Sequence, residues 1–155
     1  MKLIVTIIIS IVFLLTIQAC GNDETTERRA DAQQEEGLTE FELEHGIGPI
    51  SERLEIGEEI DQELVTKGRN IYEMKCEMCH NMEGRMVGPE LGNVLERRSP
   101  EFVMNFILNP GRMANDHPEG QKMLRKYMTV MPFQNVKEDE AKAIVEFLRY
   151  YAESN

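Results

Sequence analysis

Two cysteines and a histidine lie close together in the middle of the chain, in the segment Cys76-Glu77-Met78-Cys79-His80. This is the C-x-x-C-H pattern of c-type haem attachment. Two cysteines at this spacing near a helix end can reach the two vinyl groups on one side of a porphyrin, and the next residue can place its imidazole under the iron. The segment therefore predicts one covalently bound haem c, held by thioethers at Cys76 and Cys79 and by an axial nitrogen from His80.

Two other kinds of site use closely spaced cysteines. A thioredoxin-like redox pair requires a preceding strand within a βαβ unit, and the residues before Cys76 show no strand pattern. A structural zinc site requires further Cys or His ligands at close spacing, and outside the motif the remaining histidines are His45 and His117. Both sites therefore fit the sequence less well than a haem.

The element that must hold the motif is a helix. Apolar residues recur at helical spacing between residues 60 and 72, and Asp61 stands where a helix cap is expected. We therefore expect a first helix from about Asp61 to Lys75, which ends directly before Cys76.

Three further helices are expected after the motif. Ser99 as a cap and Pro100 in the first turn predict a second helix, and the segment Asn109-Pro110-Gly111 is expected to end it. A third helix is expected to begin near Pro118 and to end before Met131-Pro132, and a last helix covers about residues 138–151. No stretch alternates as a strand should, so the sequence predicts an all-α fold.

The first residues are typical of an export signal. Lys2 precedes a short apolar run over residues 3–17, and the segment Gln18-Ala19-Cys20-Gly21 resembles the end of a bacterial lipoprotein signal. We therefore expect residues 1–19 to be a signal peptide, and Cys20 to be the lipid anchor of an exported protein on the periplasmic or other extracytoplasmic side of a membrane. An uncleaved membrane anchor, or cleavage without lipid, would also leave the protein outside the cytoplasm.

Charge divides the expected mature chain into two parts. Residues 22–63 contain fifteen Asp or Glu and three Arg, whereas residues 64–155 contain thirteen acidic and thirteen basic residues. Residues 20–44 are also poor in aromatic and β-branched residues, so we expect a flexible acidic linker there. Residues 45–60 regain hydrophobicity and are expected to form an irregular arm, and residues 61–155 are expected to form the folded domain.

The folded domain resembles the class I monohaem cytochromes c over about three fifths of the chain. Gly68 and Tyr72 lie eight and four residues before Cys76, where this family has a small and an aromatic residue on its N-terminal helix. The segment Gly88-Pro89-Glu90-Leu91 is similar to the family's G-P-x-L segment.

This resemblance implies the class I cytochrome c fold, with about four helices around one haem. It implies that the N-terminal helix crosses the C-terminal helix closely at Gly68, with Ile144 and Phe147 as partners. It also implies that the carbonyl of Pro89 accepts a hydrogen bond from the proximal imidazole of His80, which fixes the tautomer of that ring.

The same resemblance places the distal iron ligand in a Met-Pro segment between the third and last helices, and Met131-Pro132 is the one Met-Pro pair in the chain. Met131 is therefore the expected sixth ligand. Met128 and Met113 are the competing methionines, and His45 or His117 would give bis-histidine ligation. A Met/His pair fills both axial positions, raises the potential of the iron and leaves no position for a substrate, which suits electron transfer.

Three functions remain possible on this sequence. The expected one is a membrane-tethered carrier of single electrons and not an enzyme. A gas-binding or sensor haem protein would need a labile sixth ligand, and a dihaem peroxidase would need a second C-x-x-C-H, whereas the sequence contains one.

The sequence says less about partners. Segments such as Gly46-Ile47-Gly48-Pro49-Ile50 and Val87-Gly88-Pro89 are similar to lipoprotein cytochromes that accompany nitrous oxide reductase, and a terminal oxidase is an equally sensible acceptor. The other expected contact is with the membrane, through the N-terminal lipid, and no nucleic-acid partner is expected. Candidates for a basic docking rim are Arg97, Arg98, Arg112, Lys122, Arg125 and Lys126.

Overall fold

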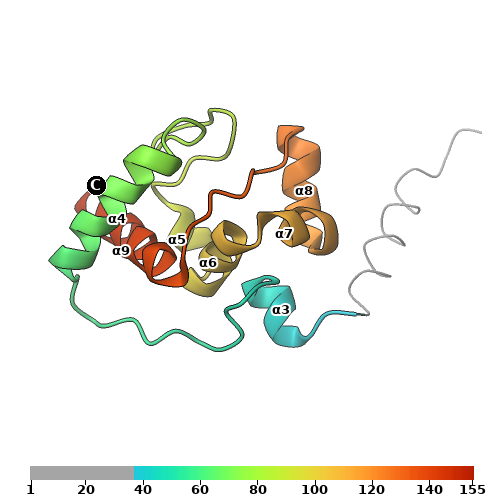
Figure 1. The fold of residues 1–155 in the computed structure, drawn as a ribbon, viewed down its shortest axis with the longest axis horizontal. Helices are drawn as coiled ribbons and strands as arrows, with labels where there is room; N and C mark the ends of the chain where they lie inside the picture. The colour runs from blue at the N-terminus through green and yellow to red at the C-terminus, as the bar shows by residue number, and fades with distance from the viewer. Residues whose placement is uncertain (1–36) are drawn as a thin grey trace, which may run out of the picture. The chain divides into compact units, whose positions relative to one another are not determined.

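The structure, a computed structural model, describes residues 37–155. The expected signal peptide, Cys20 and most of the expected linker lie outside the described residues. All regular secondary structure of residues 37–155 is helical, so the predicted all-α fold is confirmed there (Figure 1). The helices are α3 (Glu40–His45), α4 (Gln62–Lys75), α5 (Val94–Arg97), α6 (Pro100–Leu108), α7 (Pro110–Asp116), α8 (Pro118–Tyr127) and α9 (Glu138–Ser154). None of them is long and apolar enough to span a membrane.

Four of these helices correspond to the four expected from the sequence. The Asp61 carboxylate caps α4 by accepting hydrogen bonds from the backbone N–H groups of Glu63 and Leu64. The Ser99 hydroxyl caps α6 in the same way, through the N–H of Phe102. Both caps are therefore local signals that the sequence showed correctly.

The estimate of about four helices was too low for the described residues, because α3, α5 and α7 are additional. The segment Asn109-Pro110-Gly111 does end α6, but Pro110 then occupies the first turn of α7. A proline fits that position because its missing N–H has no partner in a first turn. The proline therefore separates two consecutive helices, where a loop was expected.

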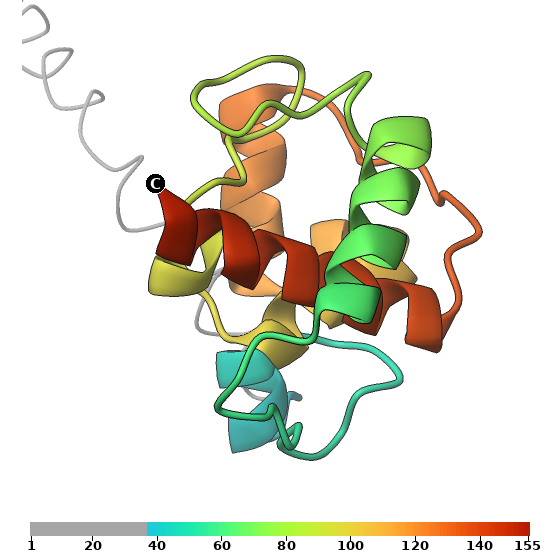
Figure 2. The same ribbon diagram turned by 90° about the vertical axis from the view of Figure 1, so that its left-hand side faces the viewer.

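The two longest helices, α4 and α9, cross each other, as Figure 2 shows, and Gly68 lies at the crossing. A Cβ atom at Gly68 would lie 1.9 Å from the backbone oxygen of Ala143, so the helices approach more closely than any side chain would allow. One turn further along α4, the rings of Tyr72 and Phe147 are 5.5 Å apart. The close crossing that the resemblance implied is therefore present, and it places the C-terminal end of α4 firmly on α9.

The expected linker over residues 20–44 is wrong at its end, because residues 40–44 belong to α3. Thr39 and Glu42 form a reciprocal cap: the Thr39 hydroxyl accepts from the Glu42 N–H, and the Glu42 carboxylate accepts from the Thr39 N–H at 2.9 Å. These bonds satisfy two N–H groups that a short acidic helix would otherwise expose. The reciprocal cap therefore stabilises a helix in a segment whose acidic composition favours a flexible linker.

Residues 46–61, between α3 and α4, form no helix or strand; their first part contacts α6, and residues 57–61 are hydrogen-bonded to Glu146 and Arg149 of α9. Ile47 and Ile50 are almost completely buried, at 1% and 5% exposure. The Asn105 amide nitrogen, on α6, lies within 3.1 Å of the carbonyl oxygens of His45, Gly46 and Ile50. Its amide oxygen accepts from the Ile50 N–H at 2.9 Å. Asn105 therefore attaches the N-terminal segment to the helical core.

Candidate functional site

The C-x-x-C-H segment forms one compact turn at the end of α4. The Cys76 N–H donates to the carbonyl of Tyr72 at 2.8 Å, as the last helical hydrogen bond of α4. The N–H groups of Cys79 and His80 then both donate to the carbonyl of Cys76, at 3.0 and 2.9 Å. The two cysteines form no disulfide with each other, and burial raises the pKa of the Cys76 thiol to about 11. The turn therefore presents two cysteine sulfurs beside one imidazole.

The His80 ring is held in one tautomer. Its Nδ1 lies 2.8 Å from the carbonyl oxygen of Pro89, and because a carbonyl can only accept, Nδ1 carries the proton. Burial lowers the pKa of His80 despite this hydrogen bond, which favours the neutral ring. Among the described residues Nε2 has no hydrogen-bond partner, so its lone pair is available to a metal. The contact that the resemblance implied for Pro89 is present.

Gly88 lies directly against this ring. A Cβ atom there would be 2.4 Å from Cε1 of His80 and 2.8 Å from Nδ1, closer than such atoms can approach. The Gly88 N–H also donates to the carbonyl of Cys79 at 2.9 Å, which ties the loop back to the motif. Glycine is therefore required at position 88 for the G-P-x-L segment to close over the imidazole. The sequence pattern included this glycine but did not show its contact with the ring.

The loop that carries Met131 runs from α8 to α9 and is fastened beside the motif. The Lys75 ammonium, at the last position of α4, donates to the carbonyls of Gln134 and Asn135 at 3.3 and 3.2 Å. Met131 itself is half-buried. Lys75 was missed by sequence reasoning, because nothing local in the sequence indicates contacts with residues 59 and 60 positions away.

A second contact joins the loop after the motif to the end of α8. The Arg85 guanidinium lies over the Tyr127 ring, 4.8 Å from its centroid, and donates to the carbonyl of Lys126 at 3.4 Å. The segments on either side of Met131 are therefore linked to residues on either side of the C-x-x-C-H turn.

The two competing histidines have both ring nitrogens engaged elsewhere. His117 donates from Nε2 to the carbonyl of Glu42 at 3.0 Å and accepts from the Glu119 N–H at Nδ1. In His45, Nδ1 lies 2.8 Å from the Ser99 hydroxyl and Nε2 lies 3.0 Å from the Arg53 guanidinium. Both rings therefore serve the packing of the N-terminal segment.

The two competing methionines are also placed unfavourably for an iron ligand. Met113 is completely buried, and its sulfur accepts from the Ile47 N–H at 3.0 Å. Met128 does not pack on the apolar face of α8. It stands at the C-cap of α8, 84% exposed, with a left-handed backbone at φ 55°. The left-handed backbone of Met128 ends the helix, and its side chain remains exposed.

The chemistry of these residues fits a haem. The two cysteine sulfurs could form thioethers with the two vinyl groups of a haem, and the neutral His80 ring could bind its iron through Nε2. A haem also needs apolar surface on both sides. Large hydrophobic side chains that are exposed around the motif and on the loop after α8 include Met78, Met86, Val87, Val130 and Phe133. They supply such a surface near both linked segments.

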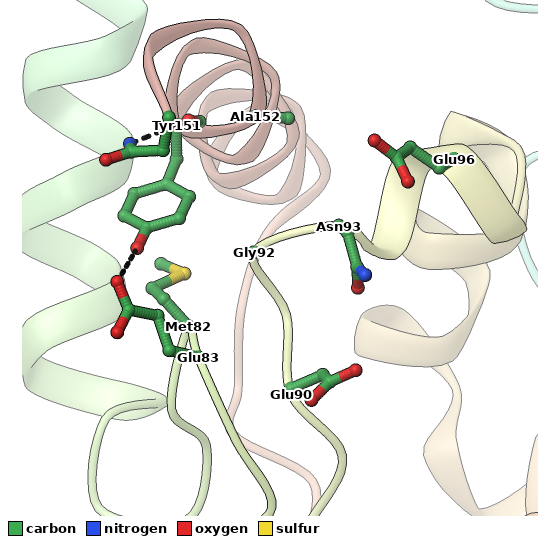
Figure 3. Close-up of a pocket in the computed structure, with 9 residues that line it drawn as sticks. Met82, Glu83, Glu90, Gly92, Asn93, Glu96, Tyr151 and Ala152 are labelled. Carbon is green, nitrogen blue, oxygen red and sulfur yellow. Dashed lines mark hydrogen bonds between the residues drawn. The ribbon is translucent and has the colours of Figure 1, made fainter.

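A separate cavity of about 270 Å³ lies beside the loop after the motif, as Figure 3 shows. The carboxylates of Glu83, Glu90 and Glu96 line it together with Asn93 and Tyr151, and the Tyr151 hydroxyl donates to Glu83 at 3.2 Å. Neither cysteine nor the histidine of the motif lines it. Within residues 37–155, no group of three or more His, Cys, Asp or Glu side chains is arranged to hold a metal ion. The acidic lining therefore does not form a metal site.

Comparison with known proteins gives consistent matches. Residues 65–152 match the family described as cytochrome c. A solved cytochrome c from Rhodothermus marinus is 36% identical and superposes with a TM-score of 0.70, covering 74% of this chain and 97% of that one. An engineered form of the Rhodothermus marinus protein is also 36% identical, with a TM-score of 0.68 and coverage of 72% and 96%. No curated protein matches the chain.

Proposed function

Because this chain belongs to the cytochrome c family, whose members bind one covalently attached haem c and carry electrons, we propose that it is a membrane-tethered carrier of single electrons with His80 and Met131 as axial ligands. The observation that carries the proposal is the C-x-x-C-H turn, in which the Pro89 carbonyl holds a neutral His80 ring with Nε2 available.

The chain's own residues have separate parts in holding the haem. Cys76 and Cys79 supply the thioether sulfurs, and Nε2 of His80 supplies the proximal ligand. A haem held by these residues would supply one-electron redox chemistry. Gly88 and Pro89 keep the imidazole in one place and one tautomer, so that the ligand does not need to reorganise when the iron changes charge.

Three observations support Met131 as the distal ligand. Pro132 lacks a backbone N–H and favours an extended conformation for the residue before it, which suits a side chain that leaves a loop. The Met131 loop is fastened beside the motif through Lys75. Met113 and His117 are engaged in other hydrogen bonds. With both axial positions filled, the iron has no open position for a substrate, which favours a carrier over an enzyme.

Carbon monoxide distinguishes the carrier from the alternative, a gas-binding protein with a labile sixth ligand. The untreated reduced protein at neutral pH is expected to show no carbon monoxide difference spectrum, because Met131 occupies the sixth position, and to titrate as a one-electron couple. The reduced protein without carbon monoxide serves as the reference. Binding of one carbon monoxide per haem without denaturant would instead support the gas-binding function.

The membrane tether is proposed from the lipoprotein-like sequence that ends at Cys20. Cys20→Ala is expected to release the protein from the membrane fraction or to leave it unprocessed, because the lipid-bearing thiol is lost. Fractionation by centrifugation and the mass of the mature N-terminus check this. A wild-type N-terminus of unmodified mass, together with unchanged membrane association of the variant, would contradict lipid attachment.

Nitrous oxide reductase and a terminal oxidase remain the proposed electron acceptors on the membrane's extracytoplasmic side. The proposed basic rim is weaker than the sequence suggested, because most of its cations have acidic neighbours. The pairs are Arg97 with Glu90 at 3.6 Å, Arg112 with Asp116 at 3.0 Å, Lys122 with Glu119 at 2.6 Å, and Arg98 with Glu119. Paired charges steer a partner less than free ones.

A further inference from the structure

Tyr72 contacts the C-x-x-C-H turn at both of its ends. Its backbone carbonyl accepts from the N–H groups of Cys76 and Glu77, at 2.8 and 3.0 Å. Its side-chain hydroxyl donates to the carbonyl oxygen of His80 at 2.9 Å. One residue of α4 therefore fixes the first and the last residue of the haem-attachment turn.

The position of this hydroxyl is itself fixed. Tyr72 is 5% exposed, and its ring packs against Phe147 of α9, one turn along α4 from the helix crossing at Gly68. Its partner is a carbonyl oxygen, which can only accept, so the Tyr72 hydroxyl is the donor of this hydrogen bond. A rigid donor of this kind restrains its acceptor.

His80 is held by three hydrogen bonds, each of which acts on a different group. Its N–H donates to the Cys76 carbonyl, and its Nδ1–H donates to the Pro89 carbonyl. Within residues 37–155, the Tyr72 hydroxyl makes the one hydrogen bond to its carbonyl oxygen. Without that bond the peptide after His80 could rotate, and the loop that carries Pro89 begins at that peptide.

We propose that the Tyr72 hydroxyl is a positioning group for the axial ligand, which fixes the His80 carbonyl and thereby keeps the imidazole aligned with the Pro89 carbonyl. An aromatic ring alone would satisfy the packing against Phe147. The hydroxyl adds a restraint on the ligand that a phenylalanine at this position lacks. The inference rests on His80 as the proximal iron ligand and is independent of Met131 and of the membrane tether.

Tyr72→Phe in the full-length haem-loaded protein tests this inference, because it removes the hydroxyl and keeps the ring. The measurement is the exchange rate of the His80 Nδ1–H with solvent, followed by NMR in the reduced state. The rate is divided by that of the Ile144 backbone N–H in α9, which reports global unfolding. We expect this ratio to rise at least tenfold, since the local restraint on the imidazole is lost while the helix crossing remains.

Tyr150→Phe is the matched control. It makes the same chemical change at a half-buried tyrosine, and no hydrogen bond of the Tyr150 hydroxyl is found among the described residues. The exchange ratio of this variant is expected to equal that of the wild type. In the wild-type protein, the Tyr72 hydroxyl proton should also be visible as a slowly exchanging resonance close to His80.

An unchanged exchange ratio in Tyr72→Phe would overturn the proposal, and so would a wild-type hydroxyl proton that exchanges as fast as that of an exposed tyrosine. Neither result would bear on electron transfer itself. Carbon monoxide binding by the wild type would count against the carrier function and would leave the exchange measurement interpretable.

Discussion

Met131→Ala protein is expected to lose the weak sulfur-to-iron absorption band, to have a lower reduction potential, and to bind one carbon monoxide per haem in the reduced state. Removing the thioether opens the sixth position of the iron, and a Met/His pair raises the potential relative to a weaker distal ligand. Visible spectra, redox titration and carbon monoxide difference spectra on the purified protein measure the three effects.

Met128→Gly is the control for this experiment. Met128 is exposed and has a left-handed backbone, which glycine adopts without steric cost, so the variant should be as stable as the wild type or up to about 1 kcal/mol more stable. Its sulfur-to-iron band and potential should remain unchanged. Loss of the band in Met128→Gly, with retention in Met131→Ala, would transfer the distal role to Met128.

Gly68→Ala is expected to destabilise the folded protein by roughly 3 kcal/mol or more, and to lower Tm by on the order of 10 °C. The added methyl group would lie 1.9 Å from the Ala143 oxygen and 2.5 Å from the Ala143 carbonyl carbon. Both atoms are backbone, so neither can rotate away and α4 must move off α9. Thermal and urea unfolding, followed by circular dichroism, measure the loss.

Gly111→Ala is the matched comparison, since Gly111 lies inside α7 and an added methyl group there meets nothing within 4 Å. Alanine is the better helix former, so this variant should gain about 0.5 to 1 kcal/mol. Equal stability of the Gly68→Ala and wild-type proteins would mean that the two helices do not approach as closely as described.

Local signals explain most of what the sequence predicted correctly. Asp61 and Ser99 cap their helices by accepting hydrogen bonds from N–H groups two or three residues away. A contact over so few residues can be predicted from the local sequence. The C-x-x-C-H turn is equally local. The contact between His80 and Pro89 spans nine residues and was expected from the family resemblance, which carried information that spacing alone does not hold.

Two kinds of feature were not predicted. The cap of α3 was visible as a Thr-x-x-Glu pattern at Thr39, but the acidic composition around it favoured a linker. The contacts of Lys75 and Asn105 join residues at least 55 positions apart, and only the folded chain brings them together. The attachment of the N-terminal segment to Asn105 and of the Met131 loop to Lys75 therefore depends on the tertiary structure and cannot be predicted from one segment.

The attachment of the N-terminal segment through Asn105 enlarges the minimal folding unit of this protein. The family match begins at residue 65, and the boundary expected from composition lies at residue 61. A chain shortened to either point would uncover the buried Met113 and would leave the Asn105 amide without the four backbone hydrogen bonds that it now makes. The autonomous domain therefore begins upstream of α3, and the segment before α4 contributes buried residues to it.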